Sequence, residues 1–109
     1  MILTSKLLDK LMNSDYIKNI YPMIGRIDTR IRWDGDEEFP FYNIELNVHL
    51  NDPDITTFNM FEKGFDPHYL INEDMMFILR MAGINRNTAT IEQVYINVLS
   101  PNGEDIYKY

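Results

Sequence analysis

Two alternating segments, IDTRIRW at residues 27–33 and YNIELNVHL at residues 42–50, decide the fold of this 109-residue chain. In each segment, apolar or β-branched side chains occupy every second position and polar or charged side chains stand between them. This period of two is that of a strand with one face in a core and the other in water. The polar segment DGDEE at 34–38 joins the two, so they are predicted to form an antiparallel hairpin. One allowed register places Arg30 opposite Glu45 on the outer face, a favourable cross-strand pair.

Helical spacing appears on both sides of this hairpin. Apolar residues recur at intervals of three and four over residues 2–12, which predicts a first helix, and residues 16–21 suit a second short helical turn. Asp66-Pro67 is a good helix start, because it provides an acceptor at the N-cap followed by proline at the first helical position. Residues 75–82 are almost continuously apolar, and Gly83 suits a C-terminal cap. We expect this helix to be buried on most of its circumference, against the sheet or against another subunit.

The remaining segments complete a small sheet. The NDPD sequence at 51–54 is a strong turn signature, and residues 51–66 contain either a third strand over 55–61 or only a loop. Residues 94–98 alternate as a strand, Ser100-Pro101-Asn102-Gly103 suits a type I turn, and residues 106–109 return as a last strand. The prediction is a single α+β domain over 1–109, with order α-β-β-(β)-α-β-β. Two main helices are expected on one face of an antiparallel sheet of four to five strands.

Composition limits the function classes. The net charge of −7 opposes general binding to nucleic acid or to an anionic membrane, because both need positive charge at the contact. The absence of cysteine removes disulfides, thiolate metal sites and cysteine nucleophiles. Apolar runs are far too short to span a bilayer, and we expect a cytoplasmic protein. Fourteen isoleucines and eleven asparagines indicate an AT-rich coding sequence, as in a virus or a low-GC bacterium.

Metal sites were sought in two places. Acids at 34, 36 and 38, with Glu45 beyond them, imitate part of a calcium-binding loop. Phe39, however, stands where such a loop needs glycine, and a solvated hairpin loop is the simpler interpretation. His49 with Asp52 and Asp54 could in principle hold a divalent ion, although Pro53 indicates a turn there. No metal and no cofactor is predicted.

Catalytic motifs were sought as well. His68 lies in the first turn of the helix that begins at Asp66-Pro67. Neither His68 nor any serine has a recognisable orienting partner that would make a nucleophile–base pair. The chain has no phosphate-binding glycine loop and no nucleophile elbow. No catalytic residue is therefore assigned.

The candidate contact residues lie on strands. The first strand carries the only basic cluster, the second strand adds aromatic, acidic and imidazole side chains on the same outer face, and two tyrosines lie on a terminal edge strand that could recruit a neighbour. The assigned residues are Arg26, Arg30, Arg32, Phe41, Glu45, His49, Tyr107 and Tyr109.

The leading hypothesis is a non-enzymatic protein-interaction or assembly domain, homo-oligomeric or part of a larger complex. The alternatives are an acidic inhibitor or decoy for a basic partner surface, a nucleic-acid-binding module using Arg26, Arg30 and Arg32, and a hydrolase or lyase with carboxylates or His49 and His68 in a cleft.

Overall fold

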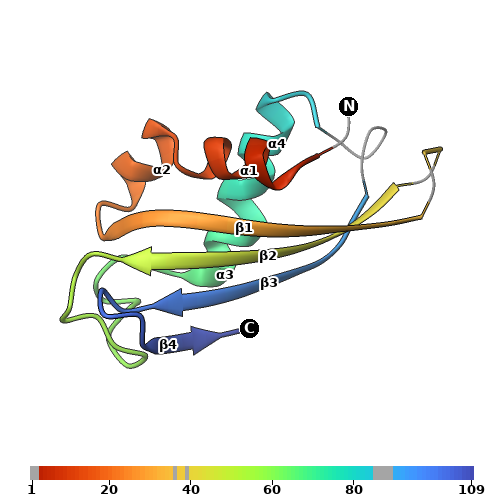
Figure 1. Ribbon diagram of the computed structural model, residues 1–109. Coiled ribbons are helices and arrows are strands. Elements are labelled where there is room, and N and C mark those ends of the chain that lie inside the picture. Colours follow the sequence, from red (N-terminus) through yellow and green to blue (C-terminus); the bar gives the residue numbers. More distant parts are fainter. Residues whose placement is uncertain (1–2, 36, 39, 85–89) are drawn as a thin grey trace.

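In the computed structural model, which describes residues 3–35, 37–38, 40–84 and 90–109, a four-stranded sheet carries helices on one face (Figure 1). The described elements, in chain order, are α1 (Ser5–Met12), α2 (Asp15–Ile20), β1 (Ile24–Gly35), β2 (Pro40–Leu50), α3 (Pro67–Tyr69), the π-helical segment η1 (Leu70–Met75), α4 (Met76–Met81), β3 (Thr90–Leu99) and β4 (Asp105–Lys108). The α+β class predicted from the sequence is confirmed.

The sheet is mixed, and here the prediction of an antiparallel sheet is wrong. The strand order is β1-β2-β3-β4, with antiparallel hairpins β1–β2 and β3–β4 joined by the parallel neighbours β2 and β3. After β2, the chain passes behind the sheet through α3, η1 and α4 before β3 begins (Figure 1). A connection of this kind returns the chain to the end where β2 started, so the next strand runs parallel to β2.

The first hairpin has the predicted register, with Arg30 opposite Glu45. A bulge between Ile24 and Arg26 inserts Gly25, so that Ile24 is buried while Arg26 lies on the outer face with the other even-numbered residues. A Cβ at Gly25 would lie 3.2 Å from the His49 carbonyl oxygen, tighter than an ordinary contact. The bulge therefore favours glycine, and it allows both Ile24 to be buried and Arg26 to lie on the outer face.

The connection over 51–66 contains turns where a third strand was considered. Asp52 Oδ1 accepts from the Asp54 N–H (2.9 Å), and the Asn59 side chain bonds the backbone at Asp54 and Thr56. These polar side chains satisfy the local backbone, so no ladder partner is required. Met60 is buried, whereas Phe58, predicted on the same strand face, is 94% exposed.

Residues 67–81 form one continuous helical rod with a π-helical middle. The Asp66 side chain accepts from the N–H groups of His68 and Tyr69, with Pro67 at the first position, as predicted. Within one chain, residues 75–82 are buried on one side only, so the sheet does not cover most of the helix circumference. Met75, Ile78 and Leu79 are buried, whereas Phe77 is 39% and Met81 72% exposed.

The first helix begins at Ser5 and not at residue 2, because Thr4 provides its cap by accepting from the Leu7 N–H. α1 lies along β1, and its polar face meets the free edge of that strand. Asn13 exchanges hydrogen bonds with the backbone of Ile27, and the Ser5 hydroxyl accepts from the Ile31 N–H. Between them, the Thr29 hydroxyl donates to Asp9 (2.6 Å). One edge of the sheet is thus covered by a helix, a common protection against unwanted strand pairing.

Candidate functional site

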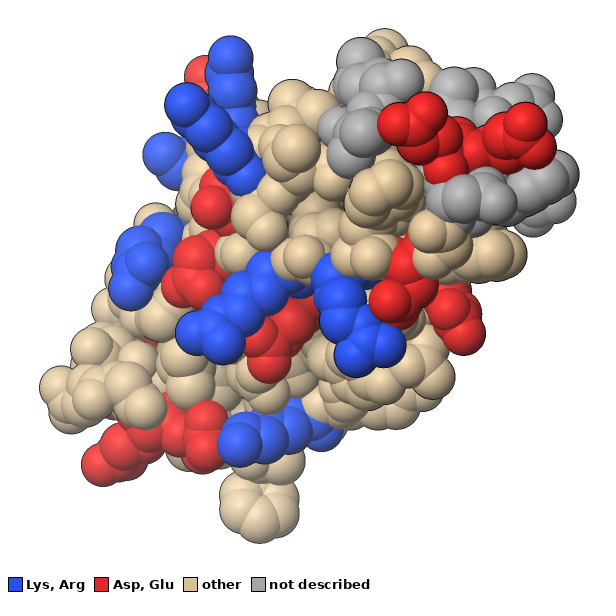
Figure 2. All heavy atoms as spheres, turned by 45° about the vertical axis from the view of Figure 1, so that its right-hand side comes forward, with Lys and Arg blue, Asp and Glu red and all other residues tan. Residues whose placement is uncertain are grey.

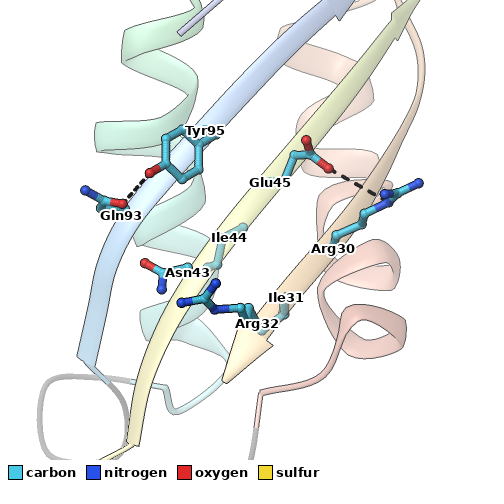
Figure 3. A pocket seen from close by; sticks show the side chains of 8 residues that line it. All are labelled: Arg30, Ile31, Arg32, Asn43, Ile44, Glu45, Gln93 and Tyr95. Carbon is cyan, nitrogen blue, oxygen red and sulfur yellow. Dashed lines mark hydrogen bonds and ion pairs between the residues drawn. The ribbon is translucent and has the colours of Figure 1, made fainter. Parts of the chain in front are cut away.

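Six of the eight predicted contact residues lie together on the sheet face opposite the helices, here called the outer face. They are Arg26, Arg30, Arg32, Phe41, Glu45 and His49. Figure 3 shows the side chains of Arg30, Arg32, Asn43 and Glu45 in front of the strands, while the helices lie behind. The sequence prediction of this shared face is correct.

The arginines of the outer face are matched by acids of the same face. Arg26 lies 3.3 Å from Asp28, Arg30 lies 3.8 Å from Glu45, and Arg32 lies 3.0 Å from Asp34. These pairs are exposed, and such pairs contribute little stability. Figure 2 likewise shows basic and acidic side chains interspersed on the visible surface. The outer face therefore carries a network of basic and acidic side chains and not a continuous basic surface.

Asp28 makes more hydrogen bonds than the other acids of this network. It lies 2.5 Å from His49 Nε2 and accepts from Asn47 (3.0 Å) as well as from Arg26. Burial alone would raise the pKa of Asp28, but the bonds from His49 and Asn47 and the charge of Arg26 outweigh it and lower that pKa. The His49–Asp52–Asp54 grouping considered for a metal does not form, because His49 contacts Asp28 on the strand beside it.

The structure describes only part of the hairpin loop, because residues 36 and 39 lie outside the described ranges. Asp34 accepts from Arg32 and Asn43, and Glu45 pairs with Arg30. Among the residues that the structure describes, no group of three or more His, Cys, Asp or Glu is placed to hold a metal ion. No helix in the described part of the chain is long and apolar enough to cross a membrane.

A shallow groove crosses the outer face over β1, β2 and β3, with a volume of about 340 Å³. Its polar walls are Arg30, Arg32, Asn43, Glu45, Gln93 and Tyr95 (Figure 3). The charged wall residues are paired, Arg30 with Glu45 within the groove and Arg32 with Asp34 beside it.

The two tyrosines predicted on the terminal strand do lie on β4 or directly after it, but both contact the helix side. Tyr107 lies with its hydroxyl 2.7 Å from His68 Nε2, and the Tyr109 ring meets the His68 ring edge-on at 4.4 Å between centroids. His68 therefore ties the start of the helical rod to the C-terminal strand.

A second surface, which the sequence did not predict, joins α2 and α4. We call Tyr16, Ile20, Phe77 and Met81 the helix face. Tyr16 stacks on Phe77 with 5.2 Å between ring centroids, and each aromatic residue has an apolar residue four positions later on its own helix. All four side chains are at least 39% exposed. Sequence analysis did not identify this surface because the apolar run 75–82 has the composition of a buried core helix.

Beneath the helix face lies a buried acid. Asp74, in η1, is 4% exposed and accepts a hydrogen bond from the Tyr21 hydroxyl. Burial, together with the Asp74 carboxylate, raises the pKa of both Tyr21 and Tyr16. Both phenols therefore stay protonated and can donate to the carboxylate across the ordinary pH range.

Comparison of the chain with known protein families, with curated proteins and with solved structures finds no match.

Proposed function

We propose that the protein is a small non-enzymatic assembly domain that binds a second copy of itself through the helix face. The observation that carries this proposal is the stacked pair Tyr16–Phe77, with Ile20 and Met81 one helical turn further along, all four at least 39% exposed. Contiguous exposed apolar patches with polar rims are typical of interaction sites, and aromatic and methionine side chains are enriched in them.

The charges around the helix face support a second copy as the partner. Exposed Asp15 precedes Tyr16 on α2, and exposed Glu73 and Arg80 lie four residues before and three residues after Phe77 along the helical rod. In a two-fold dimer the same patch meets itself, so its rim must contain both signs of charge to be self-complementary. A rim of mixed sign satisfies this requirement, whereas a strongly basic or acidic partner would favour a rim of one sign.

The described surface gives less support to the alternatives. Nucleic-acid binding would use Arg26, Arg30 and Arg32, whose charges are offset by Asp28, Glu45 and Asp34. An acidic decoy would gather its carboxylates, whereas in Figure 2 most acidic side chains lie beside basic ones and only those at the upper right stand apart from them. A hydrolase or lyase would place His49, His68 or a carboxylate in a cleft. His68 and Glu92 do line a groove between β3 and the helical rod, but His68 Nε2 is bonded to the Tyr107 hydroxyl and His49 to Asp28.

Sedimentation velocity across a wide range of micromolar concentrations tests the proposal. The native chain should shift from monomer towards dimer as the concentration rises. Phe77→Ser should remain monomeric, because it removes the aromatic residue that joins the two helices of the patch. Phe58→Ser is the matched control, since Phe58 is 94% exposed but lies on the 51–66 connection.

A native chain that is monomeric throughout would refute the proposed assembly. So would a Phe77→Ser variant that keeps its thermal transition and still dimerises as the native chain does.

A further inference from the structure

Two rows of polar side chains cross the shallow groove of the outer face, and each row takes one residue from β1, one from β2 and one from β3. The rows are Arg30, Glu45 and Tyr95 in the first and Arg32, Asn43 and Gln93 in the second. Figure 3 shows both rows from the outer side of the sheet. Because the two rows are successive positions on one face, a ligand lying on the sheet can contact both.

The charges of the groove are balanced. Arg30 lies 3.8 Å from Glu45 within the groove, and Arg32 lies 3.0 Å from Asp34 at its side. Two guanidinium groups are thus offset by two carboxylates, and these four residues carry no net formal charge. An ion gains little overall attraction from walls in which the signs balance. The groove therefore suits an uncharged ligand.

The walls nevertheless provide hydrogen-bond donors that the described residues do not use. Gln93 Oε1 accepts from the Tyr95 hydroxyl, and the NH₂ group of Gln93 makes no hydrogen bond to another described residue. Arg32 contacts Asp34 through Nε and Nη2, which leaves its Nη1 without a described partner. A ligand on the second row therefore meets donors from both sides of the groove.

Asn43 adds an acceptor between these donors. Its Nδ2 donates to Asp34 (3.2 Å), and its Oδ1 is buried without a hydrogen-bond partner. Because a carboxylate only accepts, Asp34 fixes the orientation of the amide, and Oδ1 points towards β3 (Figure 3). A buried acceptor without a donor is unfavourable. The neighbouring Arg32 and Gln93 side chains are exposed, so a small donor such as a hydroxyl group can enter between them.

Tyr95 supplies an apolar surface beside these polar groups. Its side chain is 47% exposed, and its bond to Gln93 holds the ring on the groove wall. An exposed aromatic ring next to donors and acceptors suits a sugar, whose C–H face packs on the ring while its hydroxyl groups bond at the rim. Phe41, further along β2 on the same face, is 41% exposed and provides a second ring for a longer chain.

We infer that this groove binds a neutral oligosaccharide. One sugar ring lies on Tyr95, its adjacent hydroxyl groups bond to Asn43 and Gln93, and the chain continues along β2 towards Phe41. An apolar ligand would leave the polar walls unpaired, and an anion would meet two carboxylates as well as two arginines. Strand faces of other folds bind oligosaccharides in a comparable way. The groove lies on the side of the sheet opposite the helix face, so the inference does not depend on the proposed assembly.

The probes are the neutral trisaccharides maltotriose, cellotriose, mannotriose and chitotriose, each titrated into the isotope-labelled native chain and followed by NMR. At least one should give saturable shifts at the Tyr95 ring and at the side-chain amides of Asn43 and Gln93. Its affinity should be the same at low and high salt, because salt does not screen the binding of an uncharged ligand. Inorganic phosphate and oligothymidylate serve as anionic comparisons.

Protein variants test the site from the other side. Tyr95→Ala should weaken trisaccharide binding roughly tenfold or more, whereas Tyr95→Phe keeps the ring and should retain most of the affinity. Tyr69→Ala is the matched control, since Tyr69 is an exposed tyrosine on α3. Arg32→Gln removes a charge but keeps amide donors, so it should still bind the trisaccharide. Gln93→Ala should weaken binding and repeats the test if Tyr95→Ala loses its thermal transition.

The absence of saturable binding by any of the trisaccharides would refute the inference. So would undiminished binding by a folded Tyr95→Ala, or shifts confined to the helix face. If only phosphate or oligothymidylate binds, and if Arg32→Gln and high salt abolish that binding, the groove is an anion site and the inferred ligand class is wrong. Phe77→Ser should bind the trisaccharide as the native chain does, which separates this site from the proposed assembly.

Discussion

At the scale of single residues, the Tyr21–Asp74 hydrogen bond is the interaction with the clearest expected contribution to the free energy of unfolding. The Asp74 carboxylate is 4% exposed, forms no ion pair with a basic side chain of the described residues, and accepts a hydrogen bond from the Tyr21 phenol. Leaving a buried acceptor without its donor costs about 1–3 kcal/mol. Tyr21→Phe should therefore lower the free energy of unfolding by about that amount in urea denaturation at neutral pH. Tyr95→Phe, on the outer face, should change it by less than about 0.5 kcal/mol.

The same pair predicts an alkaline pH dependence. Because the pKa of Tyr21 is raised in the folded state, the unfolded chain loses this proton first. The stability contributed by the protonated phenol is complete below a pH of about 10 and is lost as the pH rises further. The native chain should lose stability more steeply than Tyr21→Phe above that pH, and parallel curves would contradict the assignment.

Asp28 gives a prediction for the acid side of the curve of stability against pH. Its pKa is lowered in the folded state, so its stabilising contribution is present above a pH of about 4 and is lost as the pH falls through the folded value. Asp28→Asn should therefore flatten the acid limb of the stability curve. Asp54→Asn, at an exposed turn, should leave that limb unchanged. A native-like acid limb in Asp28→Asn would show that another group controls it.

At the scale of elements, local signals were read correctly where each element could be specified by its own residues. The alternation at 27–33 and 42–50 specified both strands and their pairing, and Asp66-Pro67 specified the start of the helical rod. The Ser100–Gly103 turn formed as expected, with Gly103 at φ +84°. Strand direction between hairpins is not a local property. It depends on the path of residues 51–89, for which the alternating pattern carries no signal.

Asp66 gives a prediction at this scale. Asp66→Ala removes the acceptor for two N–H groups at the start of the rod, and it should cost about 1 kcal/mol. Asp66→Asn should recover most of the loss, because asparagine is also a good cap. Thermal unfolding of the three chains provides the measurement. Equal loss in both variants would indicate that the charge, and not the cap, is what matters.

At the scale of the whole molecule, the parallel pairing of β2 with β3 is what turns two hairpins into one sheet. Asn47 and Asn97 are register partners, 2.9 Å apart between side-chain atoms. Because the chain has no cysteine, the double variant Asn47→Cys with Asn97→Cys should form one disulfide on mild oxidation. The pair Asn47→Cys with Gln93→Cys is offset by four residues and should not. Reversed results would contradict the parallel register.

The whole molecule also explains which part of the candidate site could be predicted. The outer face follows from strand parity, so its residues were found from sequence, although their mutual neutralisation depends on the register. The helix face arises from elements distant in sequence. Tyr16 meets Phe77 only after α2 and α4 are placed. How much of the apolar run 75–82 is buried within one chain depends on the same placement.

The most direct test of the proposed assembly is the response of the methionine methyl groups to dilution, observed by NMR on the labelled native chain. Met81 lies on the helix face, whereas Met12, Met60 and Met75 are buried in the core. Self-association through this face predicts that the Met81 methyl resonance moves with concentration while the resonances of the buried methionines do not. A Met81 resonance that stays fixed while the chain associates, or that never moves because the chain is always monomeric, would contradict it.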